Sequence, residues 1–352
     1  MTKKGQIYPF IFHPNLHSGV WGGNRLKPWK KLGEDTLPIG ESWEVSVVPS
    51  STSIISNGVY AGRKLSEIIE LFPEKILGVN VASQYGGQLP LLVKFIDADK
   101  DLSIQVHPDD LMAQRVHGKM GKTEMWYVID AAPNAALYAG FKEEISKEEY
   151  KQRIADGTIV DVLARHEVKP GDVFYIPAGR VHAICGGILL AEIQQSSDLT
   201  YRIYDYNRLG IDGKLRELHT ELASQALDYS VEHDYRTHYP TRENSANLVV
   251  DTPFFTVRVN EISQPIHRNL IKYDSFIISM CIKGICRIRV RETGEEIRLK
   301  EGYSCLIPAF VADYDIIPDE SNEKCRILDA FIDNKDRSLL KMVTRFLHIT
   351  KK

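Results

Sequence analysis

Three short segments carry side chains that could bind a metal ion together. Gln105 and His107 stand two residues apart in the run SIQVHPD, and residues with this spacing on a strand point to the same face. Lys122 and Glu124 have the same spacing at the start of the apolar run EMWYVI. The third segment, G-x5-P-x-G-x2-H, predicts a strand end and a tight turn that presents His182.

This set of donors suits zinc or another borderline divalent ion. Two imidazoles and one carboxylate supply three protein ligands, and a water or substrate oxygen can take the open position. The amide oxygen of Gln105 could be a fourth, weaker ligand. A single histidine on a strand usually makes only hydrogen bonds, but the turn motif that ends in His182 favours a metal site. We therefore predict one Zn²⁺ per chain.

Short strands must position these residues. Segments rich in β-branched and aromatic residues alternate with Gly, Pro, Asp and Asn clusters, a pattern typical of barrels and sandwiches. The expected strands are 89–98, 102–107, 124–130, 135–141, 172–177, 187–195, 254–262, 275–284, 285–292, 295–302 and 304–308. Amphipathic patterns predict helices outside the barrels at 65–76, 145–157 and 218–230. Pro73 should break or start a helix, and Ser146 and Gly157 should cap the second one.

An internal repeat suggests two copies of one β unit. PGDVFYIPA at 170–178 and EGYSCLIPA at 301–309 both place a Gly turn before a short strand that ends at Pro-Ala. The polar stretch 238–247 predicts a boundary, so we expect domains at 1–240 and 241–352. Asp313 stands where the first copy has His182, and no Gln-x-His pair precedes it. The C-terminal domain is therefore expected to be structural and to bind no metal.

The composition argues against several functional classes. The chain has 352 residues, 43% of them hydrophobic and 26% charged, and a formal net charge of -3. No basic excess points to a nucleic-acid partner, and no apolar run reaches the roughly 18 residues that a membrane span needs. The N-terminal segment lacks an apolar stretch of signal-peptide length, and the five cysteines contain no C-x-x-C pair. We therefore expect a cytoplasmic protein with reduced thiols.

The turn motif that ends in His182 resembles the second motif of the cupin superfamily. Glu124 follows His107 by 17 residues, which is wider than in typical cupins, and this arrangement resembles the type I mannose-6-phosphate isomerases. The matching segments are IGESWEVS (39–46), PLLVKFIDADKDLSIQVHPDD (90–110), KTEMWYV (122–128), PGDVFYIPAGRVHAI (170–184) and QQSSDLTYRIYDYNR (194–208). The resemblance covers most of residues 1–210 and is weaker beyond them.

The resemblance implies an all-β fold of two cupin-type jelly-roll barrels with a few helices packed outside. It also implies a metal-dependent isomerase that interconverts mannose 6-phosphate and fructose 6-phosphate. The implied residues are the metal ligands Gln105, His107, Glu124 and His182, the active-site Arg202, and the phosphate-side residues Lys94, Ser103 and Lys122.

The residues also suggest how such a reaction would proceed. Aldose–ketose isomerisation moves a proton between C1 and C2 through an enediolate, whose negative oxygen needs a metal or another cation beside it. Asp198 and Glu192 are candidates for the base, although each could instead orient Arg202 or a metal-ligating histidine. Arg202 could alternatively form a structural bridge with Asp198 or Asp205.

Two other functional classes are compatible with this pattern. One is another metal-dependent cupin enzyme, such as an epimerase or a dioxygenase, and the other is a non-catalytic sugar-binding or regulatory cupin. Ser103 and the basic residues at 94, 122 and 202 favour a phosphorylated sugar as substrate. The complete ligand set and Arg202 favour an enzyme over a binding protein.

Overall fold

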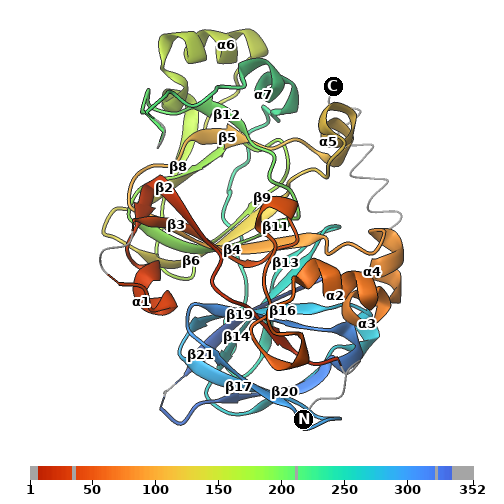
Figure 1. Cartoon of the computed structure of the whole chain (residues 1–352). Helices are drawn as coiled ribbons and strands as arrows, with labels where there is room; N and C mark the ends of the chain where they lie inside the picture. The colour runs from red at the N-terminus through yellow and green to blue at the C-terminus, as the bar shows by residue number, and fades with distance from the viewer. Residues whose placement is uncertain (1–6, 34–36, 211–212, 322–323, 335–352) are drawn as a thin grey trace. The chain divides into compact units, whose positions relative to one another are not determined.

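The computed structural model describes residues 7–33, 37–210, 213–321 and 324–334, which form mostly β-strands with a few short helices (Figure 1). The chain folds into two compact units. We call residues 14–51 and 91–238 the central unit, and residues 1–13, 52–90 and 239–352 the terminal unit. Each unit is therefore assembled from separate stretches of the chain.

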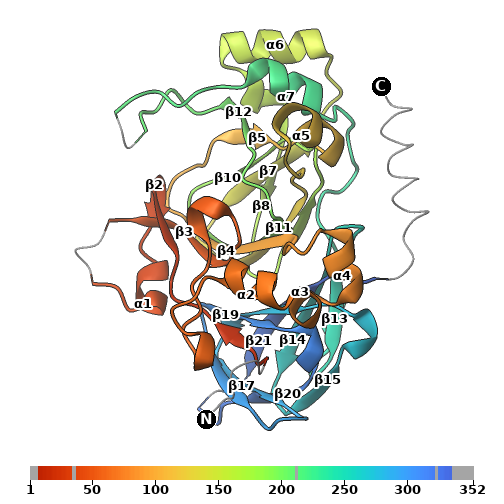
Figure 2. The ribbon, with the colours of Figure 1, turned by 45° about the vertical axis from the view of Figure 1, so that its right-hand side comes forward.

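Two antiparallel sheets form the central unit. The six-stranded sheet has the order β2 (Leu16–Gly23), β3 (Ile39–Val45), β4 (Leu91–Ala98), β11 (Ile188–Gln195), β6 (Glu124–Ala131) and β9 (Val173–Ile176). The five-stranded sheet has the order β12 (Tyr201–Tyr204), β5 (Ile104–Val106), β10 (His182–Ile184), β7 (Ala136–Phe141) and β8 (Leu163–Glu167). Figure 2 shows strands of the second sheet side by side.

The core of the central unit lies between its two sheets. Trp126 and Leu190 from the six-stranded sheet pack in one cluster with Leu137 and Ile184 from the five-stranded sheet. All four are buried, and burial of such a side chain stabilises the fold by about 1.5–3 kcal/mol. This shared apolar layer fixes which face of each strand points inward.

Helices cover the outer face of the five-stranded sheet. The helices α5 (Asp110–His117), α6 (Lys147–Asp156) and α7 (Thr220–Ala226) contribute to a second apolar cluster with that sheet. Tyr150 of α6 belongs to this cluster together with Val106 and Ile203 of the strands. Figure 1 shows α6 and α7 above β12 and β5. A further short helix, α1 (Leu26–Lys30), follows β2.

The terminal unit also contains two antiparallel sheets. The six-stranded sheet has the order β1 (Phe10–Ile11), β19 (Tyr303–Ile307), β16 (Ile277–Lys283), β21 (Cys325–Phe331), β14 (Thr256–Ile262) and β13 (Ala246–Asp251). The four-stranded sheet has the order β15 (Ile266–Asn269), β20 (Asp313–Pro318), β17 (Ile285–Val290) and β18 (Glu296–Lys300). Ile277, Ile288 and Phe331 belong to the apolar cluster that both sheets share. The helices of this unit are α2 (Leu65–Leu71), α3 (Pro73–Leu77) and α4 (Val79–Gln84).

The two units share one strand order. The order β3-β4-β11-β6-β9 of the central unit matches β13-β14-β21-β16-β19, and β5-β10-β7-β8 matches β15-β20-β17-β18. A bulge also recurs, between Trp43 and Val45 on β3 and between Leu248 and Val250 on β13. The predicted internal repeat is therefore confirmed, because its two copies form the equivalent strands β9 and β19.

The prediction of a mostly β chain with few helices is confirmed, but the sheets are open, and closure into two barrels is not confirmed. The unit boundary between His238 and Tyr239 lies close to the expected one at 240. Residues 1–13 and 52–90, which we expected in the first domain, belong instead to the terminal unit. One physical reason is that β1 pairs with β19, and such a distant pairing leaves no local pattern in the sequence.

The three predicted helical segments are helical; the segment 65–76 divides into α2 and α3, and the other two are shorter than predicted. Pro73 separates α2 from α3 and is the first residue of α3, where its missing N–H has no intrahelical partner to lose. The Ser146 hydroxyl accepts a hydrogen bond from the Glu149 amide, and Gly157 ends α6 with φ of 71°. The helix α5 was not predicted; it begins after Asp109, whose carboxylate accepts from the Met112 amide.

No helix in the part of the chain that the structure describes is long and apolar enough to cross a membrane.

We expect Ser146→Ala to lower the free energy of unfolding by about 1 kcal/mol, because the Glu149 amide loses its capping acceptor. Ser146→Asp is the matched control and should keep the cap. Urea unfolding followed by circular dichroism measures both variants. An unchanged midpoint for Ser146→Ala would show that water satisfies this amide equally well.

Candidate functional site

The interior of the central unit is polar at one end. On β4 the inward-facing residues include Lys94 and then Ile96, and on β11 they include Glu192 and then Leu190. Lys94 and Glu192 are directly opposite each other in the strand register, whereas Ile96 and Leu190 belong to the apolar core. The same strands therefore carry both the core and a group of buried charges beside it.

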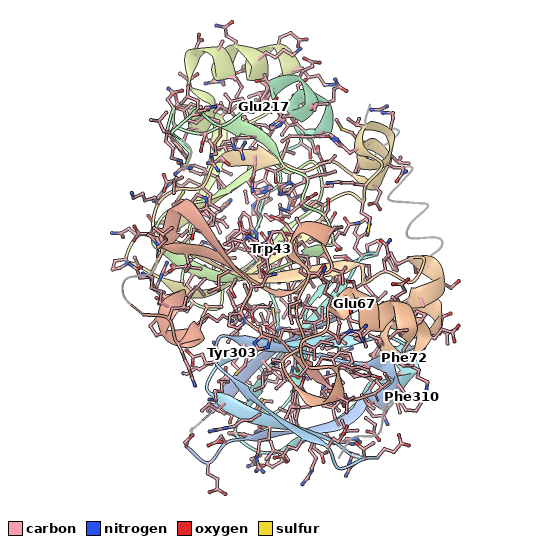
Figure 3. The ribbon with its side chains drawn as sticks, in the orientation of Figure 1. Trp43, Glu67, Phe72, Glu217, Tyr303 and Phe310 are labelled. Carbon is pink, nitrogen blue, oxygen red and sulfur yellow. The ribbon has the colours of Figure 1, made fainter. Side chains whose placement is uncertain are left out.

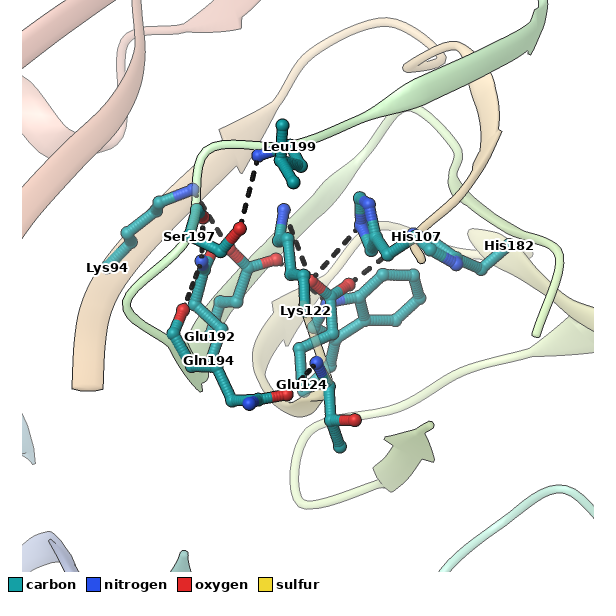
Figure 4. A network of polar contacts seen from close by, with 12 residues as sticks. Lys94, His107, Lys122, Glu124, His182, Glu192, Gln194, Ser197 and Leu199 are labelled. Atoms are coloured by element: carbon teal, nitrogen blue, oxygen red, sulfur yellow. Dashed lines mark hydrogen bonds and ion pairs between the residues drawn. The ribbon is translucent and has the colours of Figure 1, made fainter. Parts of the chain in front are cut away.

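Three side chains that can bind a metal meet at this polar end (Figure 4). The Nε2 atom of His107 lies 3.4 Å from one carboxylate oxygen of Glu124, and Nε2 of His182 lies 3.4 Å from the other. One ligand atom from each residue lies within 4.8 Å of the other two, and all three residues are buried. The structure thus brings together three of the four residues that were predicted as ligands, and we call them the triad.

Five of the six polar side-chain atoms of the triad have no hydrogen-bond partners among the described residues. Both ring nitrogens of His107, Nε2 of His182 and both carboxylate oxygens of Glu124 are buried in this state. A buried polar group without a partner costs about 1–3 kcal/mol. A divalent cation would accept these lone pairs, so the residues present fit a metal site.

The charge states of the triad also suit metal binding. Burial, assisted by the Lys122 charge, lowers the pKa of His107 to about 3, and burial also lowers the pKa of His182. Burial alone would raise the pKa of Glu124, but Lys122 and the two imidazoles outweigh it and hold that pKa well below its ordinary value. Neutral imidazoles and an ionised carboxylate are the forms that ligate metals.

The turn before His182 fixes the orientation of its ring. The Nδ1 atom donates a hydrogen bond to the Arg180 carbonyl at 2.8 Å, so Nε2 keeps its lone pair for the triad. Gly179, in the same turn, has φ of 91°, and its amide donates to the His107 carbonyl at 2.9 Å. The glycine of the sequence motif therefore joins the His182 turn to the segment that carries His107.

Hydrogen bonds to Asp110 and Gln195 fix the segment that leads into β6. The Asp110 carboxylate accepts from the Gly121 amide at 2.8 Å and from the Gln195 amide group at 3.0 Å. Gln195 in turn accepts from the Thr123 amide at 2.8 Å. A Cβ atom at Gly121 would lie 2.5 Å from the Asp110 nitrogen, so this position requires glycine. These contacts place Nζ of Lys122 3.3 Å from the triad carboxylate.

The strand register places Gln105 and Arg202 on the inner face of the five-stranded sheet. Gln105 of β5 is directly opposite both His182 of β10 and Arg202 of β12. Paired residues of antiparallel strands point to the same side, and the neighbouring Ile104 and Ile203 belong to the outer cluster. Gln105 therefore lies beside the triad, and Arg202 lies one strand further, about 10 Å from His182 by strand spacing.

Arg202 makes no ion pair with the carboxylates considered for it. Its Nη1 donates to the Glu217 carbonyl at 2.9 Å, near α7 (Figure 3), and its Nε is buried without a partner in the described chain. Asp198 pairs with Lys119 instead, and Asp205 pairs with two other arginines. The alternative of a structural bridge from Arg202 to Asp198 or Asp205 is therefore wrong.

A network of charged and indole side chains extends from the triad along the six-stranded sheet. Nζ of Lys94 lies 3.1 Å from Glu192 and 3.3 Å from Glu41. The Trp43 indole donates to Glu41 at 2.6 Å, and the Trp126 indole donates to Glu192 at 3.1 Å. Sequence reasoning did not select Glu41, Trp43 or Trp126. The one available signal was the two-residue spacing of Glu41 and Trp43 within IGESWEVS.

The three residues expected on the phosphate side lie in different surroundings. Burial would lower the pKa of Lys94, but the carboxylates of Glu192 and Glu41 outweigh it and raise that pKa. Lys122 contacts the triad, as described above. Ser103 is buried just before β5. Their contacts with a substrate stay predictions.

Of the two carboxylates considered as the base, Glu192 lies in the buried network. Burial and the nearby Glu124 charge raise the pKa of Glu192, and Lys94 and Trp126 hold its side chain. The side chain of Asp198 is 41% exposed and pairs with Lys119. The geometry therefore favours Glu192 over Asp198.

Sequence comparison relates most of the chain to known proteins. The family model "phosphomannose isomerase type I, catalytic domain" matches residues 11–135, and "mannose-6-phosphate isomerase, cupin domain" matches residues 244–318. The chain is 36% identical over 324 residues to the mannose-6-phosphate isomerase of Streptococcus mutans, covering 90% of this chain and 99% of that one. It is 35% identical over 314 residues to the probable mannose-6-phosphate isomerase GmuF of Bacillus subtilis, with 88% and 96% covered.

Solved structures show the same relationship. The mannose 6-phosphate isomerase from Bacillus subtilis superposes with a TM-score of 0.81 at 32% identity, covering 92% of this chain and 99% of that chain. A putative mannosephosphate isomerase from Archaeoglobus fulgidus, 24% identical, shares the fold with a TM-score of 0.73. On the identity and coverage of these relatives, the chain belongs to the type I mannose-6-phosphate isomerase family.

Proposed function

We propose that the protein interconverts mannose 6-phosphate and fructose 6-phosphate through an enediolate, with a divalent metal ion held by His107, Glu124 and His182. The observation that carries this proposal is the buried triad with its unpaired lone pairs. A metal ion bound there supplies positive charge that stabilises the developing enediolate oxygen. The activity named for the relatives supports the same substrate.

Zinc is our proposal for the metal, with one ion per chain. Two imidazoles and a carboxylate are a common ligand set of catalytic zinc. Gln105 lies opposite His182 in the strand register and is proposed as a weaker fourth ligand. Its neutral amide oxygen donates less than an imidazole or a carboxylate.

Glu192 is proposed to move the proton between C1 and C2 of the sugar. A base works best when its pKa is near the working pH, and burial together with the Glu124 charge shifts the pKa of Glu192 upward in that direction. The Trp126 indole and the Lys94 ammonium hold the carboxylate in one orientation.

The remaining predicted residues are proposed to face the substrate. Arg202 makes no ion pair within the described residues, so its charge is available to an anionic group. We propose that it stabilises the enediolate. Lys94, Ser103 and Lys122 are proposed to act on the phosphate side, although both lysines already contact carboxylates.

Two broader proposals complete this assignment. Each unit is proposed to be a cupin-type jelly roll, which its two facing sheets and the strand order shared by both units support.

A cytoplasmic location is also proposed. The five cysteines support it, since all are free thiols in the structure, as expected for a reducing compartment.

A coupled assay that detects fructose 6-phosphate formed from mannose 6-phosphate tests the proposed function. We expect turnover that is lost after treatment with a chelator and returns when Zn²⁺ is added. Activity that resists complete metal removal would contradict the role of the triad. Sugar binding without turnover would favour a binding cupin, and turnover of other sugars alone would favour another cupin enzyme.

The paired substitution of His107 and His182 by alanine should abolish stoichiometric metal binding, because two of the three strong ligands are lost. Elemental analysis of the purified variant measures this. His238→Ala is the control, since that side chain is 79% exposed and lies outside the triad. Full metal occupancy in the double variant would contradict the assignment of the triad as the metal site.

Arg202→Ala should lower kcat by about 100- to 1,000-fold with little change in KM, because the lost charge acts mainly on the transition state. Arg202→Lys should recover only part of the rate, since an ammonium lacks the planar fork. Arg165→Ala is the control, an exposed arginine on the same sheet. A stable Arg202→Ala protein with wild-type turnover would contradict the proposed catalytic role of Arg202.

A further inference from the structure

The terminal unit repeats part of the buried charge network of the central unit. Glu192 on β11 is opposite Lys94 on β4, and at the equivalent strands Asp329 on β21 is opposite Arg258 on β14. The same recurring bulge on the next strand confirms the alignment of the two registers. An acid and a base thus occupy matching places in both units, although their side chains differ and Arg258 is only half-buried.

The metal ligands, by contrast, are replaced in the terminal unit. Glu124 pairs with Ile176 before the Pro-Ala end of β9, and the residue that pairs at the matching place of β19 is Ile277. Asp313, expected to take the place of His182, opens β20 and pairs with His267 at 2.6 Å. The terminal unit therefore does not have the Glu and His ligands of the triad at these matching positions.

Six polar side chains converge in the interior of the terminal unit. Ser279 donates to one carboxylate oxygen of Asp329 at 2.6 Å, and Asn260 donates to the other at 2.9 Å. Nη2 of Arg268 lies 3.7 Å from the same carboxylate, which is an ion-pair contact but too long for a hydrogen bond. Tyr314 is opposite Arg268 in the strand register. The six residues, which we call the terminal polar cluster, are Arg258, Asn260, Arg268, Ser279, Tyr314 and Asp329.

The terminal polar cluster has more unused donors than acceptors. The buried atoms without a hydrogen-bond partner in the described chain are Nε of Arg258, Nε and Nη2 of Arg268, the Tyr314 hydroxyl and the Asn260 amide oxygen. Asn260 and Tyr314 have no exposed surface, and Arg268 is 9% exposed. Nε and Nη2 form the edge of a guanidinium that binds an oxyanion through two parallel hydrogen bonds.

The net charge of the cluster also favours a negatively charged ligand. The cluster contains the guanidiniums of Arg258 and Arg268 but only one carboxylate, that of Asp329, so the positive groups outnumber the negative one. Arg258 is half-buried, and its Nη2 donates to the Tyr273 hydroxyl at 2.9 Å. A ligand that is rich in acceptors and negatively charged would satisfy both the unused donors and the excess charge.

We propose that the terminal polar cluster binds one small oxyanion, held by the Nε–Nη2 edge of Arg268 and the hydroxyl of Tyr314. This site is separate from the triad and uses residues of the terminal unit alone. It revises the expectation that this part of the chain is purely structural. The proposal goes beyond the isomerase function and does not depend on it.

Equilibrium dialysis of the metal-loaded full-length protein against labelled inorganic phosphate tests the site. Lys122→Ala lowers phosphate binding near the triad, and the variants of the terminal polar cluster then identify the phosphate that binds in the terminal unit. One phosphate per chain should remain bound in it. Tyr314→Phe, added to the Lys122→Ala background, should weaken the Kd by about tenfold, because it removes one hydrogen bond to a charged ligand. Arg268→Lys should weaken it further, since an ammonium cannot form two parallel bonds.

Tyr314→Phe is the sharper variant, because it removes an atom that has no partner in the described chain and should leave the fold intact. Alone, it should keep wild-type isomerase turnover, which separates this site from the triad. Absence of phosphate binding in the Lys122→Ala background would overturn the proposal and leave internal water as the partner of the cluster. An unchanged Kd in both Tyr314→Phe and Arg268→Lys would also overturn it.

Discussion

A buried carboxylate without hydrogen bonds determines which groups the central unit must hold close to it. Glu124 has no exposed surface, and its nearest polar neighbours among the described residues are the Lys122 ammonium and two imidazoles. An ionised carboxylate in such surroundings costs several kcal/mol unless positive charge is held close to it. The glycines at 121 and 179 allow the close backbone contacts that hold Lys122 and the histidines there. The local fold is therefore arranged around one negative charge.

The sequence predicted features that depend on short local segments better than features that depend on pairing between distant strands. His107, Glu124 and His182 could be selected because each lies in a short segment with its own spacing and turn signals. The pairing of Lys94 with Glu41, and of Trp126 with Glu192, depends on the register between distant strands, which local periodicity does not contain. The same reason explains why the strands could be predicted while the membership of 1–13 and 52–90 in the terminal unit could not.

The two units show how one backbone arrangement can carry different chemistry. Strand order, register and bulge are shared, and they place an acid opposite a base on the same two strands of each unit. The residue at the position of Glu124 is Ile277 in the terminal unit, so a single change of side chain removes the charge around which the triad is arranged. Backbone pairing thus fixes where polar groups can meet, while the side chains decide what they bind.

The interleaved order of the units has a consequence for folding during synthesis. All strands of the central unit have been made once the ribosome passes residue 238, so this unit can close first. β1, by contrast, is made about 300 residues before its partner β19, and α2 to α4 are made about 160 residues before β13, the next strand of their unit. These early segments must stay uncovered while most of the chain is translated, and they are where we expect chaperones to bind the nascent polypeptide.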